Sequence, residues 1–115
     1  MTKGEIDTIQ KLLQGTKEEK IPWKFNNSNA VSWIRLVGGI QYTTLIQAGV
    51  QNYIGKAEQY NLTIQNATEG VLMQVVCTSV QGRTEFGLLD SIFELAKEQS
   101  INNTIKKIDK LFDGL

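Results

Sequence analysis

Four side chains have the chemistry to recognise a ligand or a partner surface: Trp33, Arg35, Tyr42 and Arg83. Trp33 and Tyr42 stand on either side of a predicted glycine turn, and Arg35 and Arg83 are the only arginines of the chain. Together they could form a flat stacking and anion-binding surface for a nucleotide-like ligand. Trp, Tyr and Arg also dominate protein interfaces, and aromatic pairs stabilise hairpins by packing across the strands. Cross-strand packing, a protein interface and a ligand site are therefore three open interpretations.

No arrangement of residues typical of catalysis stands out. The chain has no histidine, which excludes His-based triads, His proton shuttles and His metal sites. Cys77 is the only cysteine, so it cannot pair within the chain, and its apolar neighbours indicate a buried, inert thiol. We therefore expect no catalytic residue, no metal ligand and no cofactor, and we predict that the protein is not an enzyme. An enzyme that uses carboxylates and a metal is a third alternative.

Two clusters of like charge lie in the last third of the chain. The first is a line of carboxylates at intervals of four residues: Asp90, Glu94 and Glu98. On a helix such carboxylates repel one another unless they meet cations, so they predict a solvated face or a surface for a basic partner. The second cluster is three lysines near the C-terminus: Lys106, Lys107 and Lys110. These complement the dipole at the end of a helix.

Length and composition predict a single domain, residues 1–115. The chain has 12 Lys and Arg and 12 Asp and Glu, so it lacks the net positive charge that favours binding of nucleic acid. No stretch approaches the roughly 20 apolar residues of a membrane span, and the N-terminal residues do not resemble a signal peptide. We therefore expect a cytoplasmic protein without a nucleic-acid or membrane partner. Many amides and an excess of Lys over Arg would suit a low-GC bacterium or its phage.

The spacing of apolar residues predicts a helix followed by a sheet. Residues 4–14 have helical spacing, with a capping box formed by Thr2 and Glu5 and a stop at Gly15. A pair of glycines between two β-rich runs predicts a tight hairpin turn. The most apolar run is expected to be a central strand that is covered on both faces. The expected strands are 23–25, 31–37, 40–46, 50–54, 60–65 and, as that central strand, 71–78.

The last third of the chain is predicted to be helical. Apolar residues line one face of residues 84–99, and those between Ile101 and Phe112 continue near the same phase. A weak break at residues 100–103, where short polar side chains compete with the helix backbone, leaves one helix or two. We predict an α+β fold, with an N-terminal helix, an antiparallel meander of four to five strands, and the C-terminal helices packed on one face.

Two stretches carry a resemblance. Residues 12–23 read LLQGTKEEKIPW, and residues 88–96 read LLDSIFELA. They resemble a loose group of small, mostly uncharacterised bacterial and phage α+β proteins, in which a segment ending in Trp leads into a sheet and a Leu-Phe-Glu-Leu-Ala helix closes it. The resemblance covers the two ends of the chain alone and consists mostly of packing residues. It supports the order of elements and a prokaryotic or phage source, and it implies no catalytic residue.

The leading hypothesis is a non-enzymatic binding or regulatory module of bacterial or phage origin. It would act by protein–protein interaction, for example as an inhibitor of a host factor or of a defence against phage. The alternative is a protein that sequesters a signalling nucleotide at the interface of an oligomer. A homodimer or larger homo-oligomer is expected, because an uncovered sheet face or edge strand invites pairing.

Overall fold

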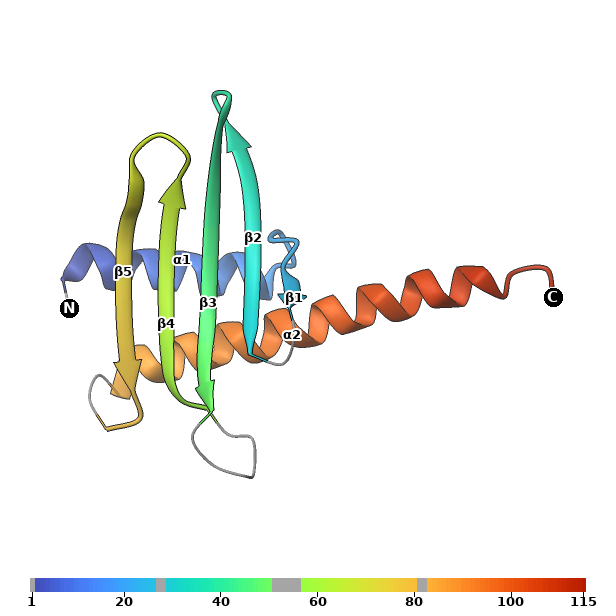
Figure 1. Cartoon of the computed structure of the whole chain (residues 1–115). Coiled ribbons are helices and arrows are strands. Elements are labelled where there is room, and N and C mark those ends of the chain that lie inside the picture. Colours follow the sequence, from blue (N-terminus) through green and yellow to red (C-terminus); the bar gives the residue numbers. More distant parts are fainter. Residues whose placement is uncertain (1, 27–28, 51–56, 81–82) are drawn as a thin grey trace.

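The computed structural model describes residues 2–26, 29–50, 57–80 and 83–115, and these form a sheet and two helices (Figure 1). In chain order the elements are α1 (Lys3–Lys17), β1 (Lys24–Asn26), β2 (Ala30–Val37), β3 (Ile40–Val50), β4 (Ala57–Asn66), β5 (Gly70–Thr78) and α2 (Arg83–Leu111). The predicted α+β fold is confirmed. The separate strand expected at 50–54 falls outside the described residues, except for Val50, with which β3 ends.

The sheet is an antiparallel meander with the strand order β1-β2-β3-β4-β5. Gly38 and Gly39 turn the chain from β2 into β3 with φ angles of 58° and 79°, which glycine adopts without steric cost. The prediction that residues 71–78 form a central strand is wrong, because β5 lies at the edge. The run is apolar, yet Val76 is exposed on the face that no helix covers, and Val71 is exposed near the β4–β5 turn.

Helix α1 begins at the predicted capping box. The Thr2 hydroxyl accepts a hydrogen bond from the Glu5 backbone, and the Glu5 carboxylate accepts one from the Thr2 backbone. The helix does not stop at Gly15 but continues to Lys17. Ile21 packs over Gly15, where a Cβ atom would come within 3.0 Å of Ile21 Cδ1, so the glycine serves close packing. The chain turns at Glu19, whose φ of 57° is left-handed.

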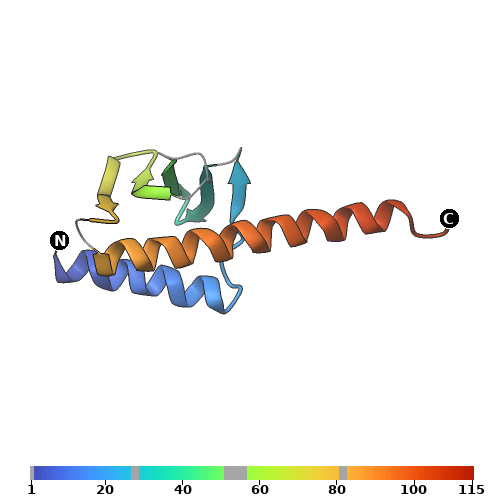
Figure 2. The same cartoon turned by 90° about the horizontal axis from the view of Figure 1, so that it is seen from below.

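Both helices lie on the same face of the sheet, with α2 next to the strands and α1 alongside α2 (Figure 2). Alternate strand residues, one side of each helix and two residues of the link between α1 and β1 form the core: Ile9, Leu12, Ile21, Trp23, Val31, Ile46, Tyr60, Leu62, Val75, Leu89, Ile92 and Phe93. Tyr60 packs against Phe86 and Phe93, with ring centroids 5.2 and 5.4 Å away, and its hydroxyl donates a 2.5 Å hydrogen bond to Asp90. Burial, and then the bond to Asp90, raise the pKa of Tyr60.

Within the described residues, the other face of the sheet is uncovered and largely polar. Its middle carries amide and hydroxyl side chains that bond to one another. The Asn61 amide oxygen accepts hydrogen bonds of 3.5 Å from Thr63 and 3.4 Å from Gln74. These contacts indicate a solvated face.

The C-terminal segment is one helix of 29 residues without a break at 100–103. The Ser100 hydroxyl accepts a hydrogen bond from the Phe25 backbone, so it is held by a tertiary contact and does not compete with the helix backbone. The Thr104 hydroxyl bonds to the Ser100 carbonyl within the helix. The two apolar sets of α2 point in different directions. At about 100° per residue, the mean direction of the outer set lies about 140° from that of the buried set. The outer set is Ile101, Ile105, Ile108 and Phe112. The buried set is Leu89, Ile92, Phe93 and Ala96. The outer half of α2 projects beyond the sheet (Figure 1).

Candidate functional site

The hairpin of β2 and β3 extends past both helices (Figure 1), and part of β2 has no neighbour on its outer side. β1 pairs with residues 30–32 of β2, whereas β3 pairs with all of β2 up to Val37. In the described part of the chain, residues 33–37 therefore lack an outer strand partner. We call residues 33–37 the open edge. Unpaired backbone N–H and C=O groups at such an edge are a template for another strand.

The open edge also carries exposed apolar side chains. Ile34, Leu36 and Val37 are 61%, 69% and 49% exposed. Because successive side chains of a strand point to opposite faces, Ile34 and Leu36 lie on the uncovered face and Val37 lies on the helix side. Natural edge strands usually carry features that block pairing, such as charge or proline. This edge has one charged residue, Arg35, and no proline, so it favours pairing with an added strand.

Three of the four predicted site residues meet at the open edge. The Arg35 guanidinium lies 5.8 Å from the centroid of the Trp33 ring, and Tyr42 is the cross-strand partner of Arg35. Trp33 also packs against the buried Trp23, with centroids 6.4 Å apart, and Arg35 is exposed. The structure does not bring Arg83 to this group: α2 begins with Arg83 below the β5 side of the sheet, across from β2 (Figures 1 and 2).

A set of hydrogen bonds joins α1, the link to β1 and α2. The buried Thr16 hydroxyl donates to the Leu12 carbonyl at 2.7 Å and accepts from the Trp23 indole Nε1 at 2.9 Å. The Gln99 amide donates to the Thr16 carbonyl at 2.8 Å. We call Thr16, Trp23 and Gln99 the clasp. It fixes the direction in which α2 leaves the body, and two of its residues lie in the segment that carries the resemblance.

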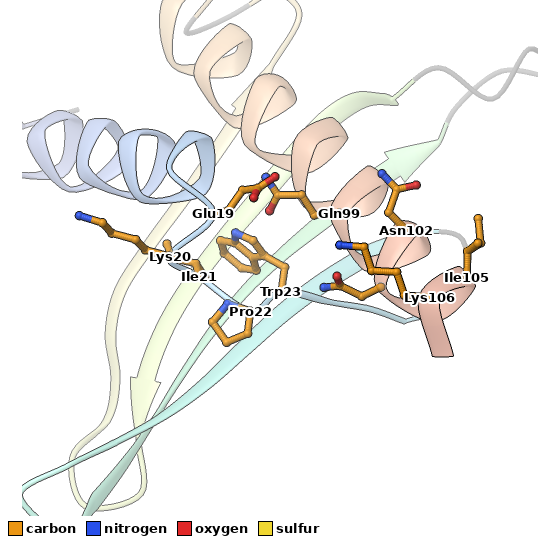
Figure 3. A pocket seen from close by; sticks show the side chains of 10 residues that line it. Glu19, Lys20, Ile21, Pro22, Trp23, Gln99, Asn102, Ile105 and Lys106 are labelled. Atoms are coloured by element: carbon orange, nitrogen blue, oxygen red, sulfur yellow. The ribbon is translucent and has the colours of Figure 1, made fainter. Parts of the chain in front are cut away.

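A hollow of about 610 Å³ opens beside the clasp (Figure 3). Lys20 and Trp23 line it from the link, and Gln99 and Lys106 line it from α2, with Lys106 pointing toward Trp23. Sequence reasoning missed this hollow, because it arises from the tertiary contact between the link and the middle of α2. The sequence assigned Lys106 to the helix dipole alone.

Burial raises the pKa of the Cys77 thiol, which disfavours the reactive thiolate. Among the residues described, no group of three or more Cys, Asp or Glu is placed to hold a metal ion. No helix in this part of the chain is long and apolar enough to cross a membrane.

No protein family, curated protein or solved structure matches the chain. The resemblance of residues 12–23 and 88–96 to small bacterial and phage proteins therefore stays a prediction.

Proposed function

We propose that the protein is a non-enzymatic binding module that captures an extended segment of another protein at the open edge. The observation that carries this proposal is the combination, along residues 33–37, of a missing outer strand, exposed apolar side chains on both faces and the Arg35 guanidinium beside the Trp33 ring. The edge strand β5 also exposes apolar residues, but it has no charged residue to select a partner. An added strand would satisfy the backbone groups, and alternate side chains would give specificity. Inhibition of a host factor is one form that such capture would take.

The side chains of the edge define the segment that it would select. On the uncovered face, Ile34 and Leu36 favour apolar side chains of the partner. On the other face, Arg35 is the one charged residue of the edge, and its guanidinium lies over Trp33. A planar guanidinium beside an aromatic ring suits a carboxylate. The preferred partner is therefore a strand with apolar residues on one face and an acidic residue on the other.

The nucleotide-sequestering alternative has less support from the geometry. It relies on Arg35 and Arg83. Arg35 lies on β2 near one edge of the sheet, whereas α2 begins with Arg83 after β5, the strand at the opposite edge. A site that uses both arginines therefore depends on an oligomer that brings these two edges together, whereas the open edge is complete in one chain. Protein capture is the function that the geometry supports best.

Photo-crosslinking tests this proposal. A photoreactive phenylalanine analogue placed at Leu36 should capture a protein in the producing cells. The same analogue at Gln47, an exposed position on β3 with a strand partner on each side, is the matched control. Crosslinks at position 36 that are absent at position 47, and that disappear with Arg35→Glu, would support strand capture. Equal yields at both positions, or no adduct at position 36, would refute it.

A further inference from the structure

The outer half of α2 presents a continuous apolar line to solvent. Every residue from 101 to 115 is exposed. Large apolar side chains recur on one side, with exposed fractions of 42%, 48%, 46% and 61%: Ile101, Ile105, Ile108 and Phe112. Phe112 directly follows the last residue of α2, and we call these four residues the α2 stripe. The opposite side of the helix carries Lys106, Lys107 and Lys110, so this half of the helix is amphipathic.

The body of the same chain leaves most of the stripe uncovered, and only Ile105 borders the hollow beside the clasp. The stripe points about 140° away from the packed side of α2, at about 100° per residue. It also lies beyond the sheet, because the outer half of α2 projects past β1 (Figures 1 and 2). A helical segment of about 12 residues is marginal in water without tertiary packing. We therefore expect the stripe to pack against another molecule.

The spacing of the stripe is self-complementary. Its members are separated by four, three and four residues, an order that reads the same in both directions. We propose that the α2 stripes of two copies pair antiparallel about a twofold axis between Ile105 and Ile108. In this register Ile101 faces Phe112 of the second copy, and Ile105 faces its Ile108. Spacings of three and four residues are those of side chains that interlock between two helices, and a twofold interface requires such self-complementarity.

Charge selects the antiparallel direction. At about 100° per residue, Glu94 and Glu98 lie on the same side of α2 as the stripe, toward the N-terminal end. A parallel pair would place Glu94 and Glu98 of one copy beside the same residues of the other copy. Neighbouring like charges repel one another. In the antiparallel pair, the carboxylates of one copy lie beyond Phe112 of the other. The two bodies then stand at opposite ends of the paired helices and do not collide.

The available area predicts a modest affinity. Leu111 and Leu115 are also exposed near the end of the stripe, which makes six large apolar side chains per copy. At roughly 100 Å² each, two copies would bury about 1,200 Å², at the lower limit of standard specific interfaces. We therefore expect a dimer with a dissociation constant on the order of micromolar, which dissociates on dilution.

Sedimentation equilibrium of the full chain tests the pairing. The wild type should change from dimer to monomer on dilution, and Ile108→Lys should raise the dissociation constant at least tenfold, because each copy places a lysine beside the axis. Leu36→Lys is the matched control: it adds the same charge at an exposed apolar residue of the open edge and should leave the dimer intact. A wild type that is monomeric at high micromolar concentration, or an Ile108→Lys variant as dimeric as the wild type, would overturn the proposal. Neither result bears on capture at Leu36, so the two proposals fail separately.

Disulfide trapping tests the direction. Cys77 is buried, so an introduced, exposed cysteine is the thiol that forms the disulfide. A mixture of Ile101→Cys and Phe112→Cys chains should give a mixed disulfide dimer under mild oxidation, identified by its mass. Ile101→Cys alone should give little dimer. The reverse result, with Ile101→Cys crosslinking to itself, would show a parallel pair and refute the proposed register.

Discussion

The clasp allows a stability prediction with an internal control. Thr16→Val replaces a hydroxyl with a methyl group of similar shape and similar helix propensity. The Leu12 carbonyl loses one donor but keeps its helical hydrogen bond. The Trp23 indole N–H, in contrast, loses its acceptor while the ring is 4% exposed. A buried donor left without an acceptor costs about 1–3 kcal/mol, so the free energy of unfolding should fall by that amount.

Thr8→Val is the matched control in the same helix. The Thr8 hydroxyl donates to the Gly4 carbonyl at 2.9 Å, with the same four-residue separation as the bond from Thr16 to Leu12. No indole depends on Thr8, so its substitution should change the free energy of unfolding by no more than about 0.5 kcal/mol. Urea unfolding followed by circular dichroism measures both variants.

A double-mutant cycle isolates the bond to the indole. In a Trp23→Phe background there is no N–H to satisfy, so Thr16→Val should cost no more there than Thr8→Val costs in the wild type. Both proteins compared in this background carry Trp23→Phe, so the effect of the smaller ring on the free energy of unfolding cancels. If Thr16→Val and Thr8→Val destabilise the wild type equally, the reasoning about the clasp is wrong.

Two further predictions concern α2 and the core. Gly87→Ala should raise the free energy of unfolding by about 0.5–1 kcal/mol, because the added Cβ meets nothing within 4 Å inside a helix. Gly15→Ala should gain less because its Cβ would press on Ile21, and equal gains in urea unfolding would contradict that role of Ile21. Burial and the bond to Asp90 raise the pKa of Tyr60 above its ordinary 10.0, so Tyr60 stabilises the fold below that pH and loses this contribution as the pH rises. Between about pH 9 and about pH 11, the free energy of unfolding of Tyr60→Phe should therefore fall less than that of the wild type. Equal falls in the two proteins would contradict this assignment.

Local signals in the sequence predicted the features that depend on near neighbours. The capping box at Thr2 and Glu5 and the turn at Gly38 and Gly39 require contacts within a few residues, and both are confirmed. The end of α1 could not be found in this way. Gly15 has the composition of a helix stop, yet Ile21 packs onto it from the link, and this contact depends on the tertiary structure.

The open edge had a signal in the sequence that went unused. The predicted strands at 23–25 and 31–37 differ in length, so the shorter one cannot pair along the whole of the longer one. The predicted meander, which the structure confirms, also places these two strands side by side at one edge of the sheet. The apolar run at 71–78 misled because an exposed edge strand and a covered central strand have the same apolar pattern.

The phase of α2 links the two proposals. A helix whose apolar side turns by about 140° between its halves cannot bury both halves against one sheet, at about 100° per residue. The inner half packs on the body, so the outer half needs a different partner, and its symmetric spacing supplies one in a second copy. In the antiparallel pair, the two open edges lie on bodies at opposite ends of the joined helices. A dimer would then hold two partner segments at once, and a partner with repeated segments would bind more tightly to the dimer than to the Ile108→Lys monomer.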